Sequence, residues 1–255
     1  MQKKRLDQIM VEKGLTQSRE RARALIMSGK VLINDQPADK PGAAVSDADM
    51  VILRGEDIRY VSRGGLKLEA ALQSFDIKTE GRVCLDAGAS TGGFTDCLLQ
   101  HGASRVFAVD VGYGQLAWKL RQDSRVVVFE RTNIRYMPPE SIPEPIDIVT
   151  IDVSFISLRI VAPAVLKLMK KDAEWLALIK PQFEVGKGRV GKGGVVKDAD
   201  LHDYVIRSLW AFFTDTGLFC QAVIPSPILG PKGNKEFIIF MKSEGKPPEG
   251  GTTDK

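Results

Sequence analysis

Two charged side chains that follow buried-looking apolar runs are the residues best suited to chemistry. Asp152 follows the run 146–151, and Lys180 follows the run 175–179 and precedes a proline. Parallel strands of an open α/β sheet end at one edge, where ligands bind, so we expect both side chains to face one crevice. A lysine can help a hydroxyl group lose its proton, and a nearby carboxylate can orient that lysine. A lone charged residue at a strand end is more commonly a solvated one.

A glycine-rich segment, 86–94, follows another strand-like run, 83–85. Glycines let the backbone approach a ligand closely, because a Cβ would stand in the way. An aspartate precedes the first glycine here, which departs from the G-x-G-x-x-G loop that binds pyrophosphate. This arrangement suits a cofactor with a cationic amino-acid end, and it favours S-adenosylmethionine over a nicotinamide cofactor. Asp110 ends the next strand 22 residues after Gly88, near the interval expected for a carboxylate that binds ribose hydroxyls. An ordinary strand-to-helix turn is the alternative.

The elements that must position these residues alternate from residue 83 onward. Strand-like runs separated by helical or loop segments predict βαβ units, a mostly parallel sheet and helices on its faces. Residues 201–216 are predicted to form a further helix, followed by final strands at 218–224 and 236–242. The five runs that precede this helix are 83–85, 105–109, 126–129, 146–151 and 175–179.

The first 58 residues have a separate apolar pattern. Two short helices are predicted within 5–28, because Gly14 can stop the first and Ser18 can cap the second. Strands are predicted at 30–34 and 49–53. This unit is large enough to form a domain of its own.

The composition narrows the class of protein. The chain has 255 residues, 44% of them hydrophobic, and a formal net charge of +4. No apolar stretch approaches the roughly 20 residues of a membrane helix, and no secretory signal is recognisable. The three cysteines, Cys84, Cys97 and Cys220, have no metal-binding spacing, so we expect reduced core thiols, no metal and a cytoplasmic location.

The sequence resembles the TlyA (hemolysin A) family of rRNA cytidine-2′-O-methyltransferases over about its first 240 residues. The resemblance rests on the segments 18–22, 61–65, 85–94, 110–116, 152–157 and 180–184. It implies an α/β fold, a class I (Rossmann-like) S-adenosylmethionine-dependent methyltransferase domain of the FtsJ-like type. It also implies a small N-terminal α-L RNA-binding domain, of the kind found in a ribosomal protein.

Site residues follow from this resemblance. The family's catalytic tetrad corresponds to Lys67, Asp152, Lys180 and Glu236, with Lys67 just before a helix and Glu236 at the start of an antiparallel last strand. Lys180 is expected to take or share the hydroxyl proton. The expected cofactor-binding residues are Asp86, Gly88, Ser90, Gly92, Gly93, Phe94, Asp110 and Asn133.

Basic residues are the candidates for contacts with ribosomal RNA in the ribosomal subunits. On a helix, Arg19 and Arg23 share a face and Arg21 points elsewhere; phosphate contacts or an ordinary solvated face would both explain them. The basic, glycine-rich segment 185–197 is either an RNA contact or a plain flexible loop. The RNA-binding candidates are Arg5, Arg19, Arg21, Arg23, Lys30 and Arg63.

The predicted domains are an RNA-binding domain at 1–58, a linker at 59–64, a methyltransferase domain at 65–243 and a disordered tail at 244–255. Directly before this linker, the chain has Ile58 where the family often has arginine, which questions a role of the segment in coupling RNA binding to catalysis. The alternatives to an rRNA methyltransferase are a non-catalytic RNA-binding factor, a membrane-lysing protein and a nicotinamide oxidoreductase.

Overall fold

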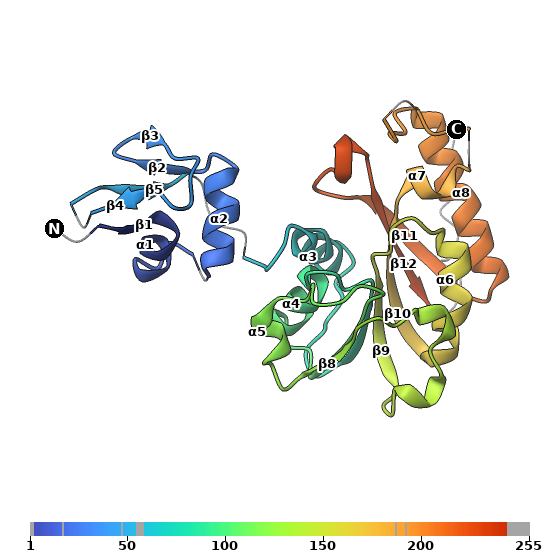
Figure 1. Ribbon diagram of the computed structural model, residues 1–255. Helices are drawn as coiled ribbons and strands as arrows, with labels where there is room; N and C mark the ends of the chain where they lie inside the picture. Colours follow the sequence, from blue (N-terminus) through green and yellow to red (C-terminus); the bar gives the residue numbers. More distant parts are fainter. Residues whose placement is uncertain are drawn as a thin grey trace. The chain divides into compact units, whose positions relative to one another are not determined.

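The computed structural model describes residues 3–16, 18–46, 48–54, 59–186, 188–191 and 193–243. The chain divides into two compact units, Met1–Arg59 and Tyr60–Lys255 (Figure 1). Each unit is described by itself below.

The N-terminal unit combines two short helices with very short strands. Helix α1 is Leu6–Glu12 and helix α2 is Arg19–Met27, whose cap Ser18 accepts a hydrogen bond from the backbone N–H of Arg21. Strand β2 lies between β3 and β5, and β1 pairs with β4, all antiparallel. The predicted helices and the predicted strands β2 and β5 are confirmed. Strands β1, β3 and β4 have only two residues each, which is too short for an alternating pattern to be recognised. The strands are β1 (Lys4–Arg5), β2 (Val31–Ile33), β3 (Gln36–Pro37), β4 (Ala44–Val45) and β5 (Val51–Leu53).

The second unit is built on a seven-stranded sheet in the order β11-β12-β10-β9-β6-β7-β8. The five strands from β10 to β8 are parallel, and β12 runs antiparallel to both of its neighbours. Ile179 pairs with Phe237, so the start of β12 lies beside the end of β10, as predicted. The strands are β6 (Val83–Ala87), β7 (Arg105–Val109), β8 (Val126–Phe129), β9 (Ile146–Ile151), β10 (Met169–Ile179), β11 (Phe219–Pro225) and β12 (Phe237–Lys242).

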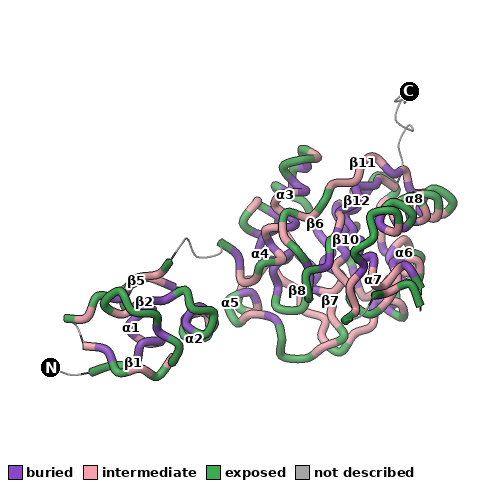
Figure 2. Tube along the Cα trace, turned by 90° about the horizontal axis from the view of Figure 1, so that it is seen from above, coloured by how far each residue is buried: buried purple, intermediate pink, exposed green. Residues whose placement is uncertain are grey.

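Helices cover both faces of this sheet. Figure 2 shows α3 and α4 on one side of the strands and α6 and α8 on the other. The helices are α3 (Gly64–Ser74), α4 (Gly93–Gln100), α5 (Trp118–Arg121), α6 (Leu158–Val165), α7 (Pro181–Glu184) and α8 (Ala199–Asp215). Short 3₁₀ turns lie at Ile134–Tyr136, Pro139–Ser141, Leu166–Leu168 and Pro231–Gly233.

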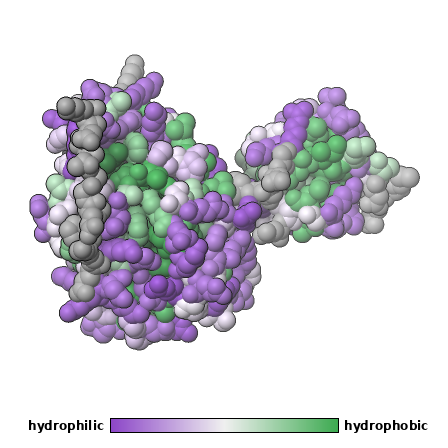
Figure 3. All heavy atoms as spheres, turned by 180° about the vertical axis from the view of Figure 1, so that it is seen from behind, coloured by the Kyte–Doolittle hydropathy of each residue, from purple (hydrophilic) through white to green (hydrophobic). Residues whose placement is uncertain are grey.

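Each unit has a hydrophobic core of its own. In the larger unit the core lies against the parallel strands, with Trp175 and Phe107 fully buried. The surface of this unit carries mostly hydrophilic side chains in the view of Figure 3, around a smaller apolar patch. The thiols of Cys84, Cys97 and Cys220 are free and buried, as expected from the sequence.

Helix α3 begins earlier than the sequence indicated. Lys67 lies in its first turn rather than before the helix, and Gly64 and Gly65 are helical. Glycine is a poor helix former, so the pattern placed the start too late. Gly65 is needed because a Cβ there would lie 2.3 Å from the ring of Tyr60, which is buried.

Some expectations lie outside the described residues, namely the substitution at Ile58 and the tail 244–255. Tyr60 and Val61, in the segment expected to link the domains, lie in the second unit, where the N–H of Val61 donates to Asp96. Within the described parts of the chain, no helix is long and apolar enough to cross a membrane.

Candidate active site

The two residues singled out at strand ends meet at the carboxyl edge of the sheet. Asp152 follows β9 and Lys180 follows β10, and these strands are parallel neighbours. Lys180 Nζ lies 2.6 Å from Asp152 Oδ1 and donates to Ser154 Oγ at 2.9 Å. Lys180 is only 8% exposed. Its burial and these two contacts hold the ammonium group in place.

A second lysine–carboxylate pair lies beside the first. Lys67 on α3 and Glu236, just before β12, are brought together with 2.6 Å between Nζ and Oε2. Glu236 is 2% exposed, and its Oε1 has no hydrogen-bond partner among the described residues. That oxygen lies against Gly230, where an added Cβ would approach within 2.0 Å.

Both pairs line one cavity of about 380 Å³. The sequence placed Asp152 and Lys180 here by strand topology, and the resemblance placed Lys67 and Glu236 with them. Arg63 lines the same cavity. The cavity therefore presents two ammonium groups and two carboxylates, with a guanidinium among its lining residues.

A second cavity, of about 480 Å³, adjoins the first. Asp110, after β7, and Asn133 line it, together with an apolar wall that includes Val109 and Ile134. The two cavities share four lining residues, Gly88, Ser90, Asp152 and Ser154. A ligand in the second cavity therefore reaches the Asp152–Lys180 pair at the shared residues.

Asp110 is anchored but retains acceptor capacity. Its Oδ2 accepts a hydrogen bond from the N–H of Ser90 at 2.8 Å, and its Oδ1 accepts one from the N–H of Gly112 at 2.6 Å. A carboxylate has about four lone-pair sites, so Asp110 can accept further bonds from ribose hydroxyls. Asn133 Oδ1 accepts from the N–H of Arg135, which fixes its side chain beside the cavity.

The structure gives a different reason for the glycines of the loop than the close approach of a ligand inferred from the sequence. Gly88 has φ +90°, and a Cβ there would lie 2.6 Å from the backbone oxygen of Asp152. A Cβ at Gly92, with φ +95°, would lie 2.2 Å from Leu120, and one at Gly93 would lie 2.2 Å from Ser62 Oγ. Glycine is required here because other parts of the protein pack against the loop, whether or not a ligand is bound.

Asp86 lies beneath the loop and lines neither cavity. Its side chain is fully buried, where it accepts hydrogen bonds from Thr95 Oγ1 at 2.7 Å and Thr150 Oγ1 at 3.2 Å. Burial raises the pKa of Asp86 to about 7. The structure thus places Asp86 as a support of the loop rather than as a direct contact of a ligand. Phe94 lines the first cavity.

Three features of the site were missed from sequence. Ser154 binds Lys180, and its position two residues after Asp152 was the available signal. Phe155 lines the second cavity, is 90% exposed and has φ +63°, a conformation that non-glycine residues rarely adopt. The segment 228–231 lines the first cavity and had no signal beyond its proline and glycine.

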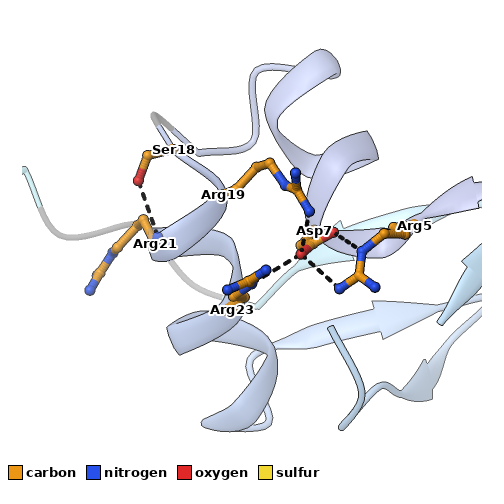
Figure 4. Close-up of polar contacts among 6 residues, drawn as sticks. All are labelled: Arg5, Asp7, Ser18, Arg19, Arg21 and Arg23. Carbon is orange, nitrogen blue, oxygen red and sulfur yellow. Dashed lines mark hydrogen bonds and ion pairs between the residues drawn. The ribbon is translucent and has the colours of Figure 1, made fainter. Parts of the chain in front are cut away.

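The basic candidates of the N-terminal unit are at its surface. Arg5, Arg19 and Arg23 converge on Asp7 (Figure 4), while Arg21 points away from it and Lys30 is exposed before β2. In the segment 185–197, Arg189 lies 5.4 Å from the ring centre of Tyr204; Lys187 and Lys192 lie outside the described residues.

Comparison with known proteins agrees with this geometry. Residues 60–243 match the family model of FtsJ-like methyltransferases, and residues 4–51 match that of the S4 domain. The chain is 48% identical to the 16S/23S rRNA (cytidine-2′-O)-methyltransferase TlyA of Mycobacterium tuberculosis, over 94% of this chain and 90% of that protein. It is 41% identical to Hemolysin A of Brachyspira hyodysenteriae, over 93% of this chain and 99% of that protein.

A solved structure supports the same grouping. A Streptococcus thermophilus protein described as a hemolysin aligns with a TM-score of 0.76 and 44% identity, covering 97% of this chain and 90% of that one. The expected fold is confirmed, with an S4 domain followed by a methyltransferase domain on a mostly parallel sheet. The chain belongs to the TlyA (hemolysin A) family of FtsJ-like methyltransferases.

Proposed function

We propose that this protein transfers a methyl group from S-adenosylmethionine to the ribose 2′-hydroxyl of a cytidine in ribosomal RNA. The observation that carries the proposal is the cavity holding the pairs Lys180–Asp152 and Lys67–Glu236, joined to a second cavity through shared residues. The M. tuberculosis relative is named for this reaction.

The second cavity fits the methyl donor that FtsJ-like methyltransferases use. An acceptor at Asp110 suits ribose hydroxyls, and the apolar wall with Asn133 suits an adenine ring. The methionine end would lie over Gly88, Ser90, Gly92 and Gly93, with Phe94 close by. S-adenosylmethionine, when bound, supplies a methyl group on a positively charged sulfur, which needs no further activation.

Lys180 is the proposed residue that moves the hydroxyl proton. An ammonium group has about three N–H donors; Lys180 donates one to Ser154 Oγ and forms an ion pair with Asp152. A remaining position of Nζ is available to the 2′-oxygen of the substrate. The 2.6 Å contact with Asp152 Oδ1 holds Nζ in place, so that Lys180 can take or share the proton of the hydroxyl as the oxygen attacks the methyl group.

Lys67 and Glu236 are the proposed positioning pair. The Lys67 ammonium keeps the potential positive where the hydroxyl becomes an alkoxide, which favours the transition state. Glu236 orients Lys67 through their 2.6 Å contact. Most of the remaining catalysis is then alignment of oxygen, carbon and sulfur.

The N-terminal unit is proposed to bind the RNA. Its match to the S4 domain and the exposed side chains of Arg5, Arg19 and Arg23 support contacts with the phosphate backbone, and Arg63 supports contact near the reaction site. We propose that residues 1–58 form the RNA-binding domain, 59–64 the linker, 65–243 the methyltransferase domain and 244–255 the tail. The proposed substrate is the ribosomal subunits in the cytoplasm.

The test is tritiated methyl transfer to ribosomal subunits and free rRNA that lack the modification, followed by nuclease mapping of the product. Label on a ribose 2′-oxygen of cytidine would establish the reaction and its position. Absence of label on every RNA, with S-adenosylmethionine bound, would instead favour the non-catalytic RNA-binding factor. A chain that bound a nicotinamide cofactor and not S-adenosylmethionine would reject the proposal.

A further inference from the structure

One buried carboxylate in the N-terminal unit organises three arginines. Asp7 has a fully buried side chain. Arg5 donates to it through Nε at 3.0 Å and Nη2 at 3.1 Å, Arg19 through Nη2 at 3.3 Å, and Arg23 through Nε at 3.1 Å. Figure 4 shows the three guanidinium groups approaching Asp7 from different sides.

The fold of this unit creates the convergence. Asp7 lies in the first turn of α1, and Arg5 is the last residue of β1, directly before that helix. Arg19 and Arg23 are one turn apart on α2, so they share the face of α2 that faces Asp7. The packing of α1 on α2, through Leu6, Leu25 and other core residues, therefore fixes where all three arginines meet.

The cluster keeps a positive charge and free donors at the surface. Three guanidinium groups against one carboxylate leave a formal charge of two positive units. The side chains of Arg5, Arg19 and Arg23 are 47%, 47% and 53% exposed. A guanidinium has about five N–H donors, and the bonds to Asp7 use two of Arg5 and one each of the others.

We propose that Asp7 is a positioning residue that holds Arg5, Arg19 and Arg23 as one preorganised binding surface for the RNA phosphate backbone. Long arginine side chains that repel one another would otherwise sample many rotamers, and ordering them on binding would weaken affinity. The planar guanidinium matches phosphate oxygens through paired N–H groups. This inference rests on the proposed function, because it assumes that the N-terminal unit binds the RNA substrate. Arg21, on the same helix, points away from Asp7 (Figure 4) and is outside this surface.

Asp7→Asn separates positioning from simple charge. The substitution adds one positive unit next to the arginines, so a surface that acts by net charge alone would bind RNA more tightly. A surface that depends on orientation binds more weakly in spite of the added charge. Glu12→Gln is the matched control, because Glu12 lies on the same helix α1 and pairs with the exposed Lys4 rather than with the arginine cluster.

The experiment measures binding of the full chain to in vitro transcribed 16S and 23S rRNA between about 50 and 300 mM KCl. Asp7→Asn is expected to weaken binding about tenfold, and Glu12→Gln to leave it unchanged or slightly tighter. Binding of Asp7→Asn as tight as that of Glu12→Gln would overturn the proposal. Thermal melting of each variant shows whether it is folded at the assay temperature.

A second variant keeps the test decisive if Asp7→Asn does not fold. Arg23→Lys retains the charge and leaves Arg5 and Arg19 on Asp7, so only the planar fork is lost. We expect about threefold weaker binding with an unchanged salt dependence; unchanged affinity would count against the proposal. Asp49→Asn, which removes a carboxylate bonded to Ser46 and Asn34, serves as a control for a general loss of stability in this unit.

Methyl transfer by the same variants distinguishes this inference from the proposed function. Asp7→Asn is expected to raise KM for rRNA with kcat and S-adenosylmethionine affinity unchanged. A lower kcat at saturating RNA would contradict a positioning role confined to RNA binding. If the unmodified protein transfers no methyl group at all, the proposed function fails, but the comparison of RNA affinities still decides the role of Asp7.

Discussion

The two units pair their carboxylates with cations in different proportions. In the N-terminal unit, one carboxylate, Asp7, contacts three arginines that are about half exposed. In the methyltransferase unit, Asp152 and Glu236 each contact one lysine that is almost completely buried. Three arginines around one carboxylate leave a positively charged surface. One lysine for each carboxylate leaves two pairs without net formal charge inside a cavity.

The two arrangements suit different tasks, namely attraction of a polyanion and chemistry inside a cavity. A surface with excess charge attracts a polyanion at long range and keeps donors for it. A buried one-to-one pair gains little stability, because removing two charges from water offsets most of their attraction. Such a pair is therefore better explained by chemistry that needs a fixed ammonium group than by the stability of the fold.

The largest expected effect is the loss of methyl transfer in Lys180→Ala. Without Nζ, the site loses the group proposed to take the hydroxyl proton. We therefore expect a decrease in kcat of about 10²–10⁴-fold. S-adenosylmethionine affinity should stay near normal. The matched control is Lys170→Ala, since Lys170 pairs with Asp147 at 2.6 Å on the same two strands but lines neither described cavity. Full activity of Lys180→Ala would remove the assignment.

Breaking the other buried pair should affect stability as well as activity. Glu236→Ala leaves the Lys67 ammonium, whose side chain is 10% exposed, without its carboxylate. We expect the free energy of unfolding to fall by about 3 kcal/mol, measured by urea denaturation. The double variant Lys67→Met/Glu236→Met should recover much of that loss while methyl transfer stays abolished. Equal stability of Glu236→Ala and the unmodified protein would show that the pair is solvated.

Asp86 differs from the carboxylates compared above, because its hydrogen-bond partners are the hydroxyl groups of Thr95 and Thr150 rather than cations. Its folded-state pKa, about 7, is higher than the ordinary value of 3.8. The stability associated with its protonated form is thus fully present below about pH 4 and is lost as the pH rises to about 7. As the pH rises from 5 to 8, Asp86→Asn should become more stable relative to the unmodified protein, by at most about 3 kcal/mol. A pH-independent difference in their melting temperatures would contradict the raised pKa.

The sequence predicted the parts of the fold that depend on local pattern and strand topology. Asp152 and Lys180 were brought together correctly because adjacent parallel strands end at one edge. Lys67 and Glu236 could not be found by that reasoning, because a helix turn and an antiparallel strand bring them in from distant parts of the chain. The support role of Asp86 also depends on its burial and on hydrogen bonds from Thr95 and Thr150, which no spacing reveals.

The smallest expected effect distinguishes arginines on one helix. Arg19→Ala removes a guanidinium that Asp7 holds, whereas Arg21→Ala removes one that points away from Asp7 (Figure 4). If the surface around Asp7 contacts phosphates, the slope of log affinity against log salt should decrease by about one for Arg19→Ala. The slope should be unchanged for Arg21→Ala, although both variants lose the same charge. Equal slopes for the two variants would mean that net charge, rather than the arrangement around Asp7, determines how the N-terminal unit binds RNA.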